Sequence, residues 1–179
     1  MSCPMCQREH NYTVPEALAV LSSTPRRLGR ATVGLSPRRA AVRPEPGKWS
    51  PKEIICHLSD CELVYGFRYR KILAEPEAVL VAFDQNAWAD GLRYGEQSLN
   101  NALASFIALR NGHVALLKSL PEEIWDKGGV HPEYGKLTLR QLICHLADHD
   151  RGHTARVESL CPPRKPAKRV KARSKSRAR

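Results

Sequence analysis

The sequence predicts an all-α protein, an up-down four-helix bundle followed by a disordered basic C-terminal tail. Three observations lead to this fold class. Ser or Thr stands three residues before Glu or Gln at Thr13, Ser50 and Thr138, a capping-box pattern that opens helices. Four segments carry apolar residues at helical spacing, and none shows a sustained strand-like alternation. The length of 179 residues suits one domain. We expect a flexible N-terminus, the bundle and the tail at residues 1–11, 12–161 and 162–179.

The first predicted helix covers about residues 14–33. Thr13 supplies the N-cap hydroxyl, a proline follows in the first turn, and Glu16 reaches back to the cap. Pro25 should kink or restart this helix, because proline lacks a backbone donor and clashes one turn back. Residues 36–48 carry three prolines and a glycine, so we predict a connecting loop there.

The second predicted helix is the clearest in the chain and runs from Ser50 to just before Pro76. Its apolar positions follow mainly helical spacing: Ile54, Ile55, Leu58, Val64, Tyr65 and Ile72. Residues 77–95 show no sustained period, which predicts a long loop that could hold one turn of helix. Loops of this length in compact domains tend to be functional.

The third and fourth predicted helices cover about residues 96–120 and 138–160. One charged residue interrupts the apolar stripe of the third. Arg110 lies four residues after Phe106 and four before Val114, so it should point toward the bundle interior or its mouth.

Histidine recurs every four residues near the end of the fourth helix, at His145, His149 and His153. Residues four apart share one helix face, so neighbouring pairs can chelate one ion. The histidine pairs do not match the H-E-x-x-H motif of zincins, because no glutamate follows the first histidine of either pair. The zincin interpretation is therefore rejected. His57, in the middle of the second helix, is the leading candidate for a third ligand. A lone histidine is more often a hydrogen-bonded core residue, but three on one helix with one on a partner favour a metal site.

The metal itself is not determined by these residues. Three neutral imidazoles suit zinc with water as a fourth ligand, and they also suit nickel, iron or manganese. Glu53 and Asp60 lie about one turn before and after His57, where they could orient its imidazole. Their alternative roles are a helix cap and a solvent-facing charge.

Three sequence blocks resemble the DinB superfamily, metal-dependent enzymes that include YfiT-like proteins and the bacillithiol and mycothiol S-transferases. The blocks are PGKWSPKEIICHLSDCE, the AFD and W of residues 82–88, and HPEYGKLTLRQLICHLADHDRGH. The resemblance covers about Leu21 to Leu160. It implies a four-helix bundle that binds one divalent cation through a histidine on helix two and an H-x3-H pair on helix four. Matched by motif, these ligands are His57, His149 and His153.

An internal similarity points to a different ligand. Residues 47–62 align without gaps to residues 135–150, which pairs His57 with His145. If the two helices began level, His149 and the histidine after it would lie roughly 6 and 12 Å further along. The ligands implied by the family then require an axial offset or a steep crossing, and the similarity could also be chance. His145 is therefore the alternative ligand.

Two classes of function follow. The first is a metal-dependent hydrolase, or a transferase in which the metal activates a low-molecular-weight thiol cosubstrate, acting on a small molecule. Arg110 would then shape the substrate pocket together with Asp84 and Trp88 from the long loop. Arg110 could instead form an interhelical ion pair, for example with Asp84. The second class is a non-catalytic protein, stabilised by its metal, that contacts nucleic acid through its tail.

The net charge of +11 is concentrated in the tail. Residues 164–179 hold 9 of the 29 Lys and Arg residues and no acidic residue, which leaves 20 basic against 18 acidic residues elsewhere. Such a segment cannot bury a core. It would contact phosphate backbones without reading their sequence, or serve only as a solubilising extension.

The sequence also predicts where the protein works. No apolar run approaches the roughly 20 residues that span a bilayer, and the N-terminus lacks the pattern of a secretory signal. We therefore predict a cytoplasmic protein that does not enter membranes and has no structural disulfide. Cys3 and Cys6 have no second CxxC to complete a zinc site and are taken as incidental. A homodimer is left open.

Overall fold

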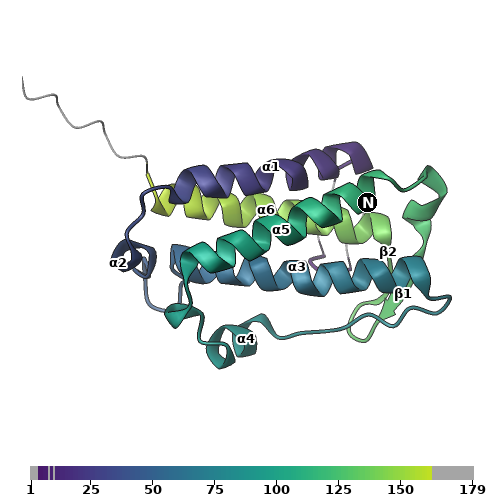
Figure 1. Cartoon of the computed structure of the whole chain (residues 1–179). Helices are drawn as coiled ribbons and strands as arrows, with labels where there is room; N and C mark the ends of the chain where they lie inside the picture. Colours follow the sequence, from purple (N-terminus) through teal and green to yellow (C-terminus); the bar gives the residue numbers. More distant parts are fainter. Residues whose placement is uncertain (1–3, 8, 10, 163–179) are drawn as a thin grey trace, which may run out of the picture.

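The computed structural model of the chain describes residues 4–7, 9 and 11–162. Residues 163–179, which form most of the predicted tail, lie outside the described residues. The predicted four-helix bundle is confirmed (Figure 1), and its long helices are α1 (Val14–Thr32), α3 (Pro51–Ala74), α5 (Leu99–Lys118) and α6 (Leu139–Leu160). None of the helices in the described part of the chain is long and apolar enough to cross a membrane.

The three predicted capping boxes begin α1, α3 and α6. In each, the hydroxyl of Thr13, Ser50 or Thr138 accepts the backbone N–H three residues later. The carboxylate or amide at that third position accepts the backbone N–H of the cap in return. α5 begins with a simpler cap, in which the Ser98 hydroxyl accepts the backbone N–H of Asn101. Local side-chain chemistry therefore determines where all four long helices start.

The helices do not simply alternate in direction along the chain. α1 and α6 run one way and α3 and α5 the other (Figure 1). α1 packs most extensively against α6, and α3 against α5. The long crossover between residues 75 and 98 makes this possible, because it returns along the bundle before α5 begins. The crossover contains two short helices, α4 (Gln85–Gly91) and η1 (Tyr94–Glu96).

α1 continues through Pro25 as one helix, so the predicted restart does not occur. Proline deprives the carbonyl of Leu21, four residues earlier, of its helical donor. Arg110 of α5 replaces that donor, with Nη1 lying 3.2 Å from the Leu21 oxygen. The tertiary structure therefore satisfies the group that proline leaves without a partner.

Regular structure is present in the loop predicted at residues 36–48 and in the chain between the last two long helices. The first holds the one-turn helix α2 (Pro37–Ala40), and the chain between α5 and α6 holds η2 (Glu122–Asp126) and a hairpin of β1 (Gly128–His131) and β2 (Gly135–Thr138). The strands are four residues each, too short for alternation to be recognised from sequence. Gly129 allows the crossover to approach the hairpin, because a Cβ there would lie 2.7 Å from the Ala78 carbonyl oxygen.

A buried polar layer divides the bundle core. One apolar cluster includes Leu21, Tyr69, Leu117 and Leu142, and the other includes Leu28, Leu58, Phe106 and Val157. Between them every long helix carries a buried polar residue: Thr24, Glu62, Arg110 and Asp150. The metal-site candidates lie near this layer on α3 and α6.

Arg110 holds the polar layer together. Its Nη2 donates to Glu62 Oε1 at 2.6 Å, and its guanidinium also donates to both carboxylate oxygens of Asp150. The second oxygen of Glu62 lies 2.8 Å from Nδ1 of His113. Arg110 therefore forms an interhelical ion pair, as one prediction had it, but its partners are Glu62 and Asp150 rather than Asp84. With its side chain buried in the core, it does not shape a substrate pocket.

Candidate metal centre

The antiparallel packing of α3 and α6 brings three of the predicted histidines together. Ring centroids lie 5.0 Å apart for His57 and His149, 5.0 Å for His57 and His153, and 4.4 Å for His149 and His153. The Nε2 atoms of His57 and His149 are 2.9 Å apart. Three imidazole rings from two helices thus lie close together, although the side chains whose ligand atoms all lie within 4.8 Å of one another are His57, Cys61 and His149, without His153.

His145 lies one turn away from this group. Its ring centroid is 6.5 Å from that of His149, and its side chain lines the adjoining cavity. The internal similarity suggested His145 on the assumption that the two helices begin level. They run in opposite directions, so the first half of α3, with His57, faces the middle and second half of α6, with His149 and His153.

Burial lowers the pKa of two of these imidazoles, those of His57 and His153. Desolvation and the neighbouring rings of His149 and His153 lower the pKa of His57 to about 2. Desolvation and His149 lower the pKa of His153 to about 3. Trp49 adds to the cover, with its ring 4.8 Å from that of His57 and 6.4 Å from that of His153. Neutral imidazoles keep a lone pair available for a metal ion at neutral pH.

The residues present fit a divalent ion. Two imidazole nitrogens on one ion, each at about 2.1 Å, are separated by about 3.0–3.4 Å, close to the 2.9 Å between the Nε2 atoms of His57 and His149. Cys61, one turn after His57, brings a sulfur into the same group. The ligand atoms of His57, Cys61 and His149 all lie within 4.8 Å of one another.

Asp150 connects the histidines to the buried polar layer. Its Oδ1 lies 3.9 Å from Nδ1 of His149, a buried nitrogen with no hydrogen-bond partner among the described residues. Burial alone would raise the pKa of Asp150, but Arg110 and His149 together outweigh it and lower that pKa to about 2. An ionised carboxylate beside a ligating imidazole favours the tautomer whose other nitrogen faces the metal.

The two carboxylates predicted to orient His57 have other partners. Glu53 accepts the Ser50 backbone N–H at 2.8 Å and the Arg43 Nε–H at 3.1 Å. Asp60 accepts the hydroxyl of Tyr94 at 2.5 Å. No hydrogen bond joins either carboxylate to His57 among the described residues, and the carboxylate beside His149 is Asp150, which no sequence pattern singled out.

A cavity of about 570 Å³ adjoins the histidines. Its lining comes from α3, the crossover, the hairpin turn and α6, and includes His57, Cys61, Arg68, Phe83, Asp84, His131, Tyr134, His145 and His149. Arg68 is buried in the wall, where Nη2 donates to the Val81 carbonyl at 2.5 Å and lies 3.1 Å from Nε2 of His131. Met5 also lines the cavity, with its sulfur 3.9 Å from the hydroxyl of Tyr65. Part of the N-terminal segment thus packs against the candidate site.

Of the two crossover residues predicted to line a substrate pocket, Asp84 lines the cavity and Trp88 does not. Asp84 lines the cavity, although its Oδ1 accepts the backbone N–H groups of Asn86 and Ala87 at the start of α4. Trp88 packs on Phe83, with ring centroids 4.9 Å apart, and does not line the cavity. Arg68 and His131 were not predicted. The only signal for His131 was its place in the HPEY block.

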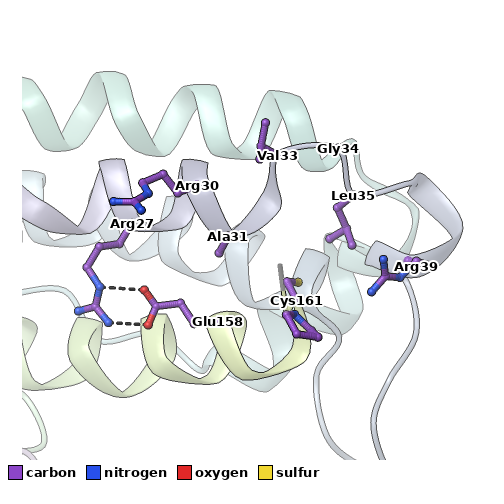
Figure 2. Close-up of a pocket in the computed structure, with 10 residues that line it drawn as sticks. Arg27, Arg30, Ala31, Val33, Gly34, Leu35, Arg39, Glu158 and Cys161 are labelled. Carbon is purple, nitrogen blue, oxygen red and sulfur yellow. Dashed lines mark hydrogen bonds and ion pairs between the residues drawn. The ribbon is translucent and has the colours of Figure 1, made fainter. Parts of the chain in front are cut away.

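A second hollow, of about 660 Å³, lies at the end of the bundle where α1 and α6 finish (Figure 2). Arginines and apolar side chains line it, and Arg27 donates to both carboxylate oxygens of Glu158, at 2.9 and 2.7 Å. Its lining contains no histidine. His57 and His149 line the first cavity, whereas His153 lines a separate, smaller hollow together with Trp49.

Comparison with known proteins identifies the family. The model of the DinB superfamily matches residues 21–157. The chain belongs to the DinB superfamily. A protein of Oceanobacillus iheyensis named "putative metal-dependent hydrolase" is 24% identical over 151 residues, which are 84% of this chain and 87% of the relative. A Bacillus cereus protein of the same name is 26% identical over 140 residues, 78% of this chain and 80% of the relative.

The fold is also that of a solved DinB-type structure. YfiT from Bacillus subtilis, described as a probable metal-dependent hydrolase with an unusual four-helix bundle topology, superimposes with a TM-score of 0.77. The match covers 89% of this chain and 94% of YfiT, at 21% sequence identity. At that identity the likeness concerns the fold.

Proposed function

We propose that this DinB-superfamily protein is a metal-dependent hydrolase of a small molecule, with one divalent ion held by His57, His149 and His153. The observation that carries the proposal is the close approach of these three imidazole rings, two of which, those of His57 and His149, line a cavity. The names of the relatives, which span most of this chain, support the same activity.

The two helices and the cavity define what each part would do. A bound divalent ion would polarise a substrate carbonyl or phosphoryl oxygen and lower the pKa of water. His57 and the two α6 histidines would hold it from facing helices, so that side-chain packing keeps the donors in place. The volume of about 570 Å³ is that of a small-molecule site. Arg68 and His131 provide polar groups in the wall for orienting a substrate.

Water is the proposed nucleophile because the relatives are named as hydrolases. A low-molecular-weight thiol would make the protein an S-transferase, and no comparison supports that choice. The identity of the ion has to be found by elemental analysis, since the three histidines suit zinc, nickel, iron or manganese. A protein that binds metal but turns over no substrate would fit the non-catalytic alternative.

Metal content of single-histidine variants tests the site. We expect one equivalent of divalent metal in the wild type and a large loss in His57→Ala, His149→Ala and His153→Ala, measured by elemental analysis of purified protein. His145→Ala is the matched control, one turn away on α6, and should keep its metal. Loss of metal from His145→Ala with retention in His153→Ala would contradict the proposed ligands.

Activity is tested separately on a panel of ester, amide and phosphoester substrates, with and without low-molecular-weight thiols. We expect metal-dependent hydrolysis that does not need a thiol and disappears in the three ligand variants. Turnover only with a thiol would assign a transferase. No turnover by fully loaded protein would contradict an enzymatic role.

A further inference from the structure

We propose that Cys61 is a fourth, sulfur ligand of the metal ion. α3 and α6 would then each supply one pair of donors four residues apart, His57 with Cys61 and His149 with His153. This inference rests on the proposed metal site. It adds a ligand that differs chemically from the three imidazoles.

The placement of Cys61 supports this role. Residues four apart on a helix share a face, and Cys61 is buried with its sulfur 3.5 Å from Nε2 of His57. This is the nitrogen that lies 2.9 Å from Nε2 of His149. The sulfur therefore joins an existing cluster of metal-ligating side chains.

The distances are close to those of ligands on one ion. With a metal–sulfur bond of about 2.3 Å and a metal–nitrogen bond of about 2.1 Å, tetrahedral geometry separates sulfur from nitrogen by about 3.6 Å. The observed separation of Sγ from His57 Nε2 is 3.5 Å. Sγ also lies 3.8 Å from Nδ1 of the same ring, so the thiol lies alongside the imidazole.

The other buried cysteines on the same two helices point elsewhere. Cys56 of α3 lies with its sulfur 4.0 Å from the Tyr94 carbonyl oxygen. Cys144 of α6 lies 3.6 Å from the carbonyl oxygen of Tyr12. A buried cysteine in these helices therefore does not necessarily lie beside the histidines. Cys61 does, whereas Cys56 and Cys144 do not.

Sulfur ligation would change the chemistry of the centre. The metal–sulfur bond forms as the thiol loses its proton to solvent, so one thiolate charge offsets part of the charge of the ion. A thiolate with imidazoles favours zinc over manganese. Four protein donors also complete a tetrahedral set, so a water or substrate would bind by expanding the coordination to five.

Cobalt(II) provides a test that does not depend on activity. The full-length protein, stripped of metal with a chelator, is titrated with cobalt while its absorption spectrum is recorded. We expect a near-ultraviolet sulfur-to-cobalt charge-transfer band that saturates at one equivalent. In Cys61→Ser and Cys61→Ala the band should be lost while cobalt still binds, as shown by elemental analysis after gel filtration. Cys56→Ser, from the same helix and similarly buried, should keep the band.

The outcomes separate this inference from the proposed function. Cobalt bound to the wild type without the band would overturn the role of Cys61 and leave the histidine site standing. Absence of bound cobalt in the wild type would overturn both. A band that survives in both Cys61 variants, or disappears in Cys6→Ser, would assign the sulfur to another cysteine.

Discussion

Among single residues, Asp150 has the most unusual position. It is fully buried, it forms the ion pair with Arg110 that holds the polar layer, and its Oδ1 lies 3.9 Å from Nδ1 of His149. One carboxylate thus serves both the interior of the bundle and a candidate metal ligand. Glu62 pairs with the same arginine, and its second oxygen lies beside Nδ1 of His113.

We therefore predict different effects for Asp150→Asn and Glu62→Gln. Each leaves Arg110 with only one carboxylate, so each should lower the free energy of unfolding by about 3–5 kcal/mol in chemical denaturation. Only Asp150→Asn should also weaken metal binding, by about 10–100-fold in competition with a chelating indicator, because it removes the charge beside His149. Equal metal affinities in the two variants would limit Asp150 to a structural role.

Among the elements, α3 has an ionised carboxylate, that of Glu53, in its first turn, and this carboxylate accepts hydrogen bonds from both Arg43 and the Ser50 cap. Burial raises the pKa of Glu53, but the hydrogen bonds from Arg43 and Ser50 outweigh it and leave the pKa below its usual 4.5. A carboxylate with a lowered pKa in the folded state stabilises the protein above its unfolded pKa. That stabilisation is lost as the pH falls through the lowered value.

We predict that Glu53→Gln makes the free energy of unfolding depend less strongly on pH in the acidic range. Between about pH 5 and pH 3 the wild-type free energy of unfolding should fall more steeply than that of the variant, since the variant has no carboxylate to protonate at this cap. Arg43→Met should flatten the same range by removing the guanidinium partner. Thermal or chemical denaturation at several pH values measures both. Parallel profiles for Glu53→Gln and the wild type would contradict this account of the cap.

Element prediction succeeded where the signal was local. The starts of α1, α3 and α6 followed from capping residues within three positions of each other. The continuity of α1 through Pro25 did not, because the donor that replaces the lost N–H belongs to Arg110, 89 residues from Leu21. The β1–β2 hairpin was not predicted for a different reason, because strands of four residues carry almost no periodic signal.

On the scale of the whole molecule, a metal at the candidate centre would connect α3 to α6 across the bundle. A ligand that binds only the folded state stabilises it by mass action, by about 2.7 kcal/mol at a hundred times the dissociation constant. We predict that metal at this excess raises the melting temperature by roughly 5–10 °C over chelator-treated protein. Calorimetry of wild type and His57→Ala, which should show little shift, measures this. A similar shift in His57→Ala would place the stabilising metal elsewhere.

The basic C-terminal segment gives a second prediction at this scale. Nine Lys and Arg residues at 164–179 are expected to contact phosphate backbones, and each contact contributes about −0.9 to the slope of log affinity against log salt. We predict weak, sequence-independent DNA binding. The slope of log affinity against log salt should be no steeper than about −8. A chain that ends at Cys161 should lose this binding. Metal content should be the same in both chains. Unchanged DNA affinity after truncation would exclude the segment as the binding element.

From its sequence alone, this protein could be described as a DinB-type four-helix bundle with a cluster of histidines that can ligate a metal. Caps and i, i+4 spacing act over one or two helical turns, so the chain order of residues is enough to recognise them. The tertiary structure decided which histidines face each other, since antiparallel packing sets His57 against His149 and His153 rather than His145. It also paired Arg110 with Glu62 and Asp150 and built the cavity from five separate segments. These features depend on contacts between residues 40 or more positions apart, which no local pattern encodes.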